Sequence, residues 1–170
     1  YGTTQKMEDM RIEGKEFSEN GLFIYEGEFF DDQRNGKGKE YYENGKLKYE
    51  GEYFRNTWSG KGKKYYENGN LLFEGEYLSG NTEGSGKEYY ENGNLLFEGD
   101  FLNGKRWTVK GYNINGNYEF EIINGKGHLK EYNRYNGKLI FEGEYLNGER
   151  NGKGKEYDIA RSEERFSRNA

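Results

Sequence analysis

The chain has 170 residues, a plausible length for one domain, and 31% of them are hydrophobic whereas 34% are charged. The 18% of aromatic residues argues against a disordered chain, while the scarcity of aliphatic residues argues against a thick two-layer core. A net charge of −5 disfavours nucleic acid and anionic membranes as partners, and the lack of cysteine excludes disulfides and thiolate metal sites.

The patterned part of the chain is predicted to span residues 14–157. Residues 1–13 form an N-terminal extension, for which the sequence leaves helix and disorder both open. The start of a repeated unit then recurs at a spacing of 24 residues (25 to 49, 49 to 73, 73 to 97), after a half unit in residues 14–21. The units begin at Tyr25, Tyr49, Phe73, Phe97, Tyr118 and Phe141. This regularity predicts a repeat architecture.

Each unit contains two predicted strands. YEGEY alternates an aromatic residue or glycine with glutamate, and GKEYY forms the second strand. The Asn-Gly step of ENGN or ENGK predicts a two-residue type I′ turn, and a longer loop is expected at the other end of each strand pair. With Asn92 and Gly93 at the turn centre, the expected pairs are Tyr90–Leu95, Tyr89–Leu96, Glu88–Phe97, Lys87–Glu98 and Gly86–Gly99.

This register predicts two different faces. Opposed glycines, such as Gly62 and Gly75, remove side chains from one face, and a flanking ring such as Phe73 or Tyr77 is expected to lie over them. On the opposite face, lysines face glutamates and form a ladder of charge pairs.

These residues resemble a known repeat family. Tyr49, Gly51, Tyr53, Gly60, Gly62 and Tyr66 fit the pattern of MORN repeats (membrane occupation and recognition nexus). The ENG turn and the FEGEYLNG-type stretches are similar to the variant common in bacteria and protists. The resemblance implies an all-β fold, an elongated single-layer antiparallel β-meander of about six to seven hairpins and roughly a dozen strands. It does not imply one activity, since the family includes scaffolds, membrane-junction proteins, peptide-binding adaptors and modules attached to enzymes.

Residues 97–140 depart from the repeat. The unit at Phe97 is short, and Phe120 occupies a glycine position. Counting back from the turn at Asn136 and Gly137 places Lys130 opposite Gly143 and Glu131 opposite Glu142. Because like charges facing each other are unfavourable, we expect a β-bulge near residues 132–135 to restore the register.

A bend is therefore expected in residues 105–135. It should place Trp107, Tyr112 and Phe120 near one another beside the binding face, where this irregular stretch would provide partner specificity. The tail, residues 158–170, loses the pattern. Asp158 is a candidate N-cap for a short C-terminal helix, with Ile159 and Phe166 on one face, that would cover the open sheet edge.

Residues that could support catalysis are weak candidates. Residues 84–87 read GSGK but lack the remainder of a phosphate-binding loop. Carboxylate pairs such as Glu74 and Glu76 recur in every unit, whereas a hydrolase site is singular. His128 is the single histidine, so neither a transition-metal site nor a catalytic triad is supported. We predict that the chain is not an enzyme and uses no cofactor or metal.

The leading hypothesis is a non-enzymatic scaffold that binds a protein or peptide segment along its aromatic–glycine face. Since a single-layer sheet has no second layer, its aromatic stripe is expected to be partly exposed. The predicted contact residues are Tyr49, Tyr53, Phe73, Tyr77, Phe97, Phe101, Trp107, Phe141 and Tyr145. Trp58 and Trp107 are expected in inter-strand loops, either as binding anchors or folded onto the sheet. The partner is expected to present an apolar segment with basic residues.

Other functions remain open from the sequence. A module that binds acidic phospholipid would use several lysines against an unfavourable net charge: Lys37, Lys39, Lys61, Lys63, Lys64 and Lys153. An antitoxin-like or adhesin-like role in a bacterium is a further alternative. Open sheet edges would permit oligomers, and a cytoplasmic location, associated with cytoskeleton or membrane, is expected.

Overall fold

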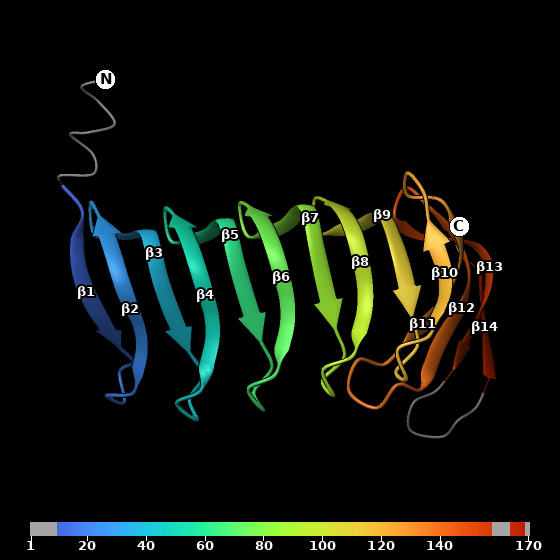
Figure 1. Ribbon diagram of the computed structural model, residues 1–170, viewed down its shortest axis with the longest axis horizontal. Coiled ribbons are helices and arrows are strands. Elements are labelled where there is room, and N and C mark those ends of the chain that lie inside the picture. Colours follow the sequence, from blue (N-terminus) through green and yellow to red (C-terminus); the bar gives the residue numbers. More distant parts are fainter. Residues whose placement is uncertain (1–9, 158–163, 169–170) are drawn as a thin grey trace. The chain divides into compact units, whose positions relative to one another are not determined.

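The computed structural model describes residues 10–157 and 164–168, which form strands, turns and short connections (Figure 1). The chain divides into two compact units, Tyr1–Asn81 and Thr82–Ala170. From residue 10 onward, the first unit contains six strands: β1 (Ile12–Phe17), β2 (Phe23–Phe30), β3 (Gln33–Tyr41), β4 (Leu47–Phe54), β5 (Thr57–Tyr65) and β6 (Leu71–Leu78). Each pairs antiparallel with the next along the chain. The predicted all-β antiparallel meander is confirmed.

In its described residues, the second unit contains eight strands. They are β7 (Asn81–Tyr89), β8 (Leu95–Leu102), β9 (Lys105–Tyr112), β10 (Tyr118–Ile122), β11 (Gly127–Tyr132), β12 (Leu139–Leu146), β13 (Glu149–Tyr157) and β14 (Glu164–Arg168). Strands β7 to β10 pair in chain order, and β11 to β14 form a separate four-stranded sheet. An isolated bridge between Ile123 and Lys126 connects β10 to β11. The sheet is thus interrupted at residues 123–126, within the stretch where a bend is predicted, and the bend itself stays a prediction.

The two kinds of turn are exchanged between the ends of the hairpins relative to the prediction. The connections that were expected to be longer loops are two-residue turns. Both central residues have positive φ, as in Arg55 (47°) and Asn56 (66°) between β4 and β5. The ENG segments form three-residue loops instead. In the β7–β8 hairpin, Tyr90 N donates to Asn94 O, Gly93 N donates to Tyr90 O, and Gly93 has a φ of 95°. This is the pattern of a type I turn followed by a left-handed glycine.

Most of the predicted β7–β8 register is confirmed. Gly86 lies opposite Gly99, and the two neighbouring pairs toward the loop are also as expected. Tyr89, however, pairs with Leu95 rather than Leu96, because the register shifts by one residue after Glu88. A bulge at this point absorbs the extra residue that a three-residue loop introduces.

The irregular β11–β12 hairpin has the register of the regular hairpins, with the same shift before its loop and without the extra β-bulge expected near residues 132–135. Lys130 lies opposite Glu142, and the shift falls between Glu131 and Tyr132. Leu129 takes the position opposite Gly143. The additional residue lies in the loop, where Asn133 N donates to Lys138 O across one more residue than in the ENG loops.

The expected C-terminal helix is wrong where the structure describes the tail. Residues 164–168 form β14, which pairs antiparallel with β13. Pairing with an open edge satisfies the backbone groups of a short segment, whereas a helix of this length is not stable alone. The proposed cap at Asp158 lies outside the described residues.

Candidate functional site

Glycine pairs lie beneath aromatic rings, as predicted. Gly51 faces Gly62 across β4 and β5, and the ring of Tyr49 covers the pair. A Cβ on Gly62 would lie 2.3 Å from the Tyr49 hydroxyl oxygen. That hydroxyl donates a hydrogen bond to the carbonyl of Glu52 at 3.0 Å. The ring is therefore fixed at both its face and its tip.

The expectation that the aromatic stripe is partly exposed is wrong. The buried members of the predicted contact set are Tyr49, Tyr53, Phe73, Tyr77, Phe97, Phe101, Phe141 and Tyr145. Their relative exposure does not exceed 8%. The rings pack edge to face along the sheet, with 5.3 Å between the centroids of Tyr49 and Tyr53 and 5.7 Å between those of Tyr49 and Tyr77. The stripe is the core of the molecule, and partner contact through it stays a prediction.

A covering residue, either arginine or tryptophan, lies over four of the rings and was not predicted from the sequence. It stands at a constant offset from the ring (25 to 34, 49 to 58, 97 to 106, 141 to 150). The guanidinium carbon lies 4.1–4.3 Å from the ring centroid in three cases, namely Arg34 over Tyr25, Arg106 over Phe97 and Arg150 over Phe141. In the fourth case, Trp58 stacks on Tyr49 at 4.6 Å and 7°. The constant offset was the available signal.

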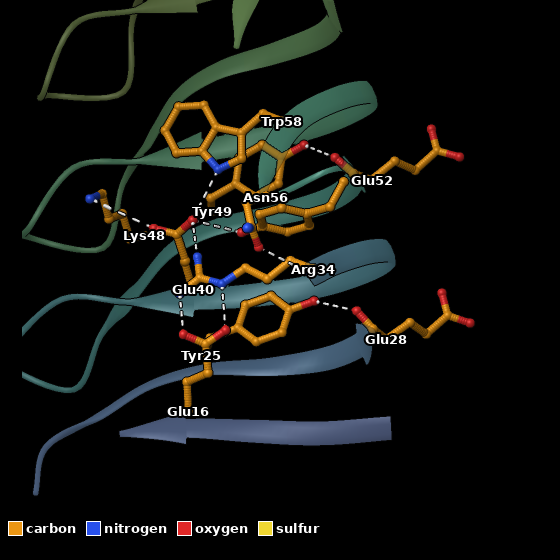
Figure 2. Close-up of polar contacts among 11 residues, drawn as sticks. Glu16, Tyr25, Glu28, Arg34, Glu40, Lys48, Tyr49, Glu52, Asn56 and Trp58 are labelled. Atoms are coloured by element: carbon orange, nitrogen blue, oxygen red, sulfur yellow. Dashed lines mark hydrogen bonds and ion pairs between the residues drawn. The ribbon is translucent and has the colours of Figure 1, made fainter. Parts of the chain in front are cut away.

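The covering arginines are held by carboxylates, as Figure 2 shows for Arg34. Arg34 donates from Nε and Nη2 to Glu16, at 2.9 and 3.1 Å, and from Nη1 to Glu40 at 2.9 Å. Glu40 Oε1 also accepts from the Tyr53 hydroxyl at 2.8 Å and from Trp58 Nε1 at 3.1 Å. The carboxylate of Glu40 thus joins residues of three strands.

The environment of these groups shifts their pKa values. Burial raises the pKa of Tyr25 to about 12, although the charge of Arg34 opposes this shift. Burial alone would lower the pKa of Arg34, but its hydrogen bond and charge interactions with Glu16 and Glu40 outweigh burial and raise the pKa. The cluster therefore stays neutral at its tyrosines and charged at its arginine around neutral pH, which suits structural support.

The same arrangement recurs in the second unit. Arg106 makes two hydrogen bonds to Glu88, at 2.9 and 3.1 Å. Arg150 makes two to Glu131, at 2.9 and 2.8 Å. Glu88 is 8% exposed and also pairs with Arg134 from the β11–β12 loop.

Both tryptophans lie in strands, not in the predicted loops. Trp58 is in β5 and is half-buried on Tyr49. Trp107 is in β9, half-buried, with its ring against Gly125. The predicted cluster of Trp107 with Tyr112 and Phe120 is wrong. Phe120 packs on Phe97 and over Gly111, whereas Tyr112, the next residue of β9, faces the other side of the sheet and contacts Tyr118.

The opposite face of the first unit carries a groove of about 840 Å³, called the charged groove below. Glycine backbone lines it between alternating charged side chains, and its lining includes Gly27, Gly38, Gly51, Lys37, Lys39, Lys61, Glu50 and Glu52. The expected lysine–glutamate register is confirmed, with Lys39 opposite Glu50. Lys37, Lys39 and Lys61 are exposed. Within the described residues, none of these three forms an ion pair.

The glutamates of this face are partly engaged elsewhere. Glu52 accepts a hydrogen bond from the backbone N–H of Lys61 at 2.6 Å, where β5 bulges past β4. Glu26 accepts from the hydroxyl of Tyr41 at 2.7 Å. Glu50 is exposed as well, so the charged groove offers a partner lysine ammonium groups together with the Glu50 carboxylate.

Nothing in the described ranges resembles a metal centre. In residues 10–157 and 164–168, no group of three or more histidine, aspartate or glutamate side chains could hold an ion. His128 lies between Glu144, at 3.0 Å, and Glu142, at 3.6 Å, on an exposed surface. None of the described segments is a helix long and apolar enough to cross a membrane.

Two family models match the chain. The MORN repeat model matches residues 25–46 and 141–158. The MORN repeat variant model matches residues 58–78 and 82–103. No curated protein matches the sequence. The matched segments carry the ring–glycine motif in both units.

Proposed function

Because the chain is a MORN-repeat protein, and such repeats are generally non-catalytic modules that bind proteins or membranes, we propose that it binds an extended segment of a partner protein in the charged groove. The observation that carries the proposal is the contrast between the two faces. The rings are buried beneath Arg34 and Trp58, whereas the charged groove is open and holds exposed lysines that form no ion pair with any described residue. The partner segment would present carboxylates to Lys37, Lys39 and Lys61.

Charge reversal in the charged groove tests this proposal. The variant Lys37→Glu/Lys39→Glu/Lys61→Glu should lose the partner, since three attractive contacts become repulsive. The matched control is Lys46→Glu/Lys126→Glu/Lys138→Glu, which changes the net charge equally at exposed lysines outside the groove. Both would be checked for folding by circular dichroism, and proteins captured from source cells would be quantified by mass spectrometry. Capture of the same proteins by both variants would contradict the proposal.

Binding of a partner along the aromatic stripe is a second candidate function, and it requires a rearrangement of the covering side chains. A partner there would have to displace Arg34 and Trp58 from the rings of Tyr25 and Tyr49. Arg34→Ala would then strengthen capture, because it uncovers a ring. Weakened or unchanged capture would count against this face.

Acidic phospholipid is favoured by one observation: Lys37, Lys39, Lys61 and Lys63 lie exposed on one face and form no ion pair within the part of the chain that the structure describes. The net charge of −5 opposes it. Flotation with phosphatidylserine vesicles at physiological salt, repeated with the two charge-reversal variants, distinguishes lipid from protein as the ligand of the groove.

A further inference from the structure

Strand β1 has the residue pattern of β3, and β3 is paired with a neighbouring strand on both of its edges. Strand β3 is its counterpart one unit later (14 to 38, 16 to 40). There, Gly38 lies between Gly27 of β2 and Gly51 of β4, and Glu40 lies between two tyrosines, Tyr25 and Tyr49. Both neighbours of β3 are thus aromatic-Glu-Gly-Glu-aromatic strands in the same register.

Strand β1 has such a neighbour on one side. Gly14 faces Gly27 and Glu16 faces Tyr25, both in β2. Within the described residues, no strand pairs with the other edge of β1. The free edge of β1 can therefore pair with a further strand of the pattern that β2 and β4 share.

Three observations mark a ring position that no residue in the described ranges fills. At Gly38, the ring of Tyr25 occupies the space above the glycine, whereas at Gly14 the nearest group is Phe29 of β2. Phe29 is half-buried, whereas its counterparts Tyr53 and Tyr77 are buried, at 3% and 5% exposure. Each of those counterparts contacts a ring of the preceding unit, at 5.3 Å from Tyr25 and 5.7 Å from Tyr49.

The residue that would cover such a ring is also present and uncovered. Met10 occupies the position of Arg34 and Trp58 (10, 34, 58), the residues that lie over Tyr25 and Tyr49. Met10 is 58% exposed. A hollow of about 510 Å³, lined in part by Glu16, Phe29 and Arg34, opens on this side of the sheet.

We propose that the outer edge of β1 accepts a strand of a partner polypeptide with the pattern aromatic-Glu-Gly-Glu-aromatic, antiparallel to β1. Its glycine lies opposite Gly14 and its first glutamate opposite Lys15. Its first ring lies opposite Glu16, over Gly14, in edge contact with Phe29 and beneath Met10. Backbone hydrogen bonds supply the general affinity of strand addition, and the ring and glycine supply specificity.

A synthetic peptide tests this arrangement directly. FEGEYLNG, the sequence of residues 141–148, should bind the full chain and slow amide hydrogen exchange in residues 12–17. Replacing its glycine by alanine (FEAEYLNG) should weaken binding by about tenfold or more, since a Cβ on the equivalent Gly27 would lie 2.5 Å from the Cα of Gly38. Replacing its first ring (AEGEYLNG) should weaken binding similarly.

The protein variant Met10→Ala provides an independent test. Because Met10 is exposed in the free chain, the free energy of unfolding should not change, while the affinity for FEGEYLNG should fall by about threefold to tenfold. Equal binding of FEGEYLNG and FEAEYLNG would overturn the proposal. So would the absence of new protection in residues 12–17, or protection of those amides before peptide is added.

Discussion

Tyr49 and the glycines beneath it show how single residues determine this fold. The ring occupies the volume that a side chain on Gly51 or Gly62 would need, and its hydroxyl is bonded to the chain at Glu52. The glycines are thus required by close approach of the ring, since Gly62 does not have a positive φ.

Gly62→Ala should lower the free energy of unfolding by about 1–3 kcal/mol, because the added methyl overlaps the ring of Tyr49. Urea denaturation measures the change. In the double variant with Tyr49→Leu, the two losses should be less than additive, because the smaller side chain leaves room for the methyl. Strict additivity would show that Tyr49 and Gly62 do not interact.

The carboxylates that bind the covering arginines should make the free energy of unfolding depend on pH. The Glu131 side chain is 15% exposed, and burial alone would raise its pKa. Hydrogen bonds from Arg150 and Tyr145 outweigh burial and lower the pKa below 4.5. A carboxyl whose pKa is lowered by folding stabilises the protein above its unfolded pKa, and this contribution is lost as the pH falls through the folded pKa.

Glu131→Gln should therefore reduce the free energy of unfolding at pH 7 and flatten its decline below about pH 4.5. Urea denaturation at several pH values measures both effects. The control Glu121→Gln, at an exposed position, should leave the profile unchanged. A parallel profile for wild type and Glu131→Gln would refute the role of this carboxylate.

At the scale of the hairpin, the two turn types are exchanged relative to the sequence prediction. An Asn-Gly step favours both a type I′ turn and a three-residue loop that ends in a left-handed glycine, so the sequence alone does not separate them. The position of Asp31 and Asp32, both with positive φ, gave no such signal because aspartate is common in many turns.

Exchanging turn residues tests this assignment. Asp31→Asn/Asp32→Gly should raise the free energy of unfolding by about 0.5–1 kcal/mol, since both residues have positive φ in the folded chain. Asn92→Gly should lower it, because Asn92 is not among the residues with positive φ and its side chain accepts a hydrogen bond from Asn94 N at 2.9 Å. The opposite signs, in thermal or urea unfolding, would restore the original prediction.

Part of the fold and little of the site could be predicted from the sequence. Period-two alternation and the spacing of glycines determine the strands and the register of Gly86 with Gly99. The burial of the rings depends on residues from the following strand, such as Arg34 and Trp58, which periodicity within one strand does not reveal. The open charged groove could not be located, because it requires knowing which face is left uncovered.

At the scale of the whole chain, each unit has its own means of burying apolar surface. The first uses rings, glycines and covering side chains on one sheet. The second adds the four-stranded sheet of β11 to β14 and buries aliphatic residues, including Leu96, Val109, Ile122 and Leu129. The aromatic stripe therefore forms part of the core, and the charged face of the first unit is the surface that we propose for a partner.

Lysine footprinting of the protein in complex with its captured partner tests this division most directly. Brief acetylation followed by mass spectrometry compares the reactivity of each lysine in the free and bound chain. The proposed function predicts that Lys37, Lys39 and Lys61 lose reactivity on binding, while Lys46, Lys126 and Lys138 keep theirs. Unchanged reactivity of the groove lysines in a complex that survives the labelling would contradict it.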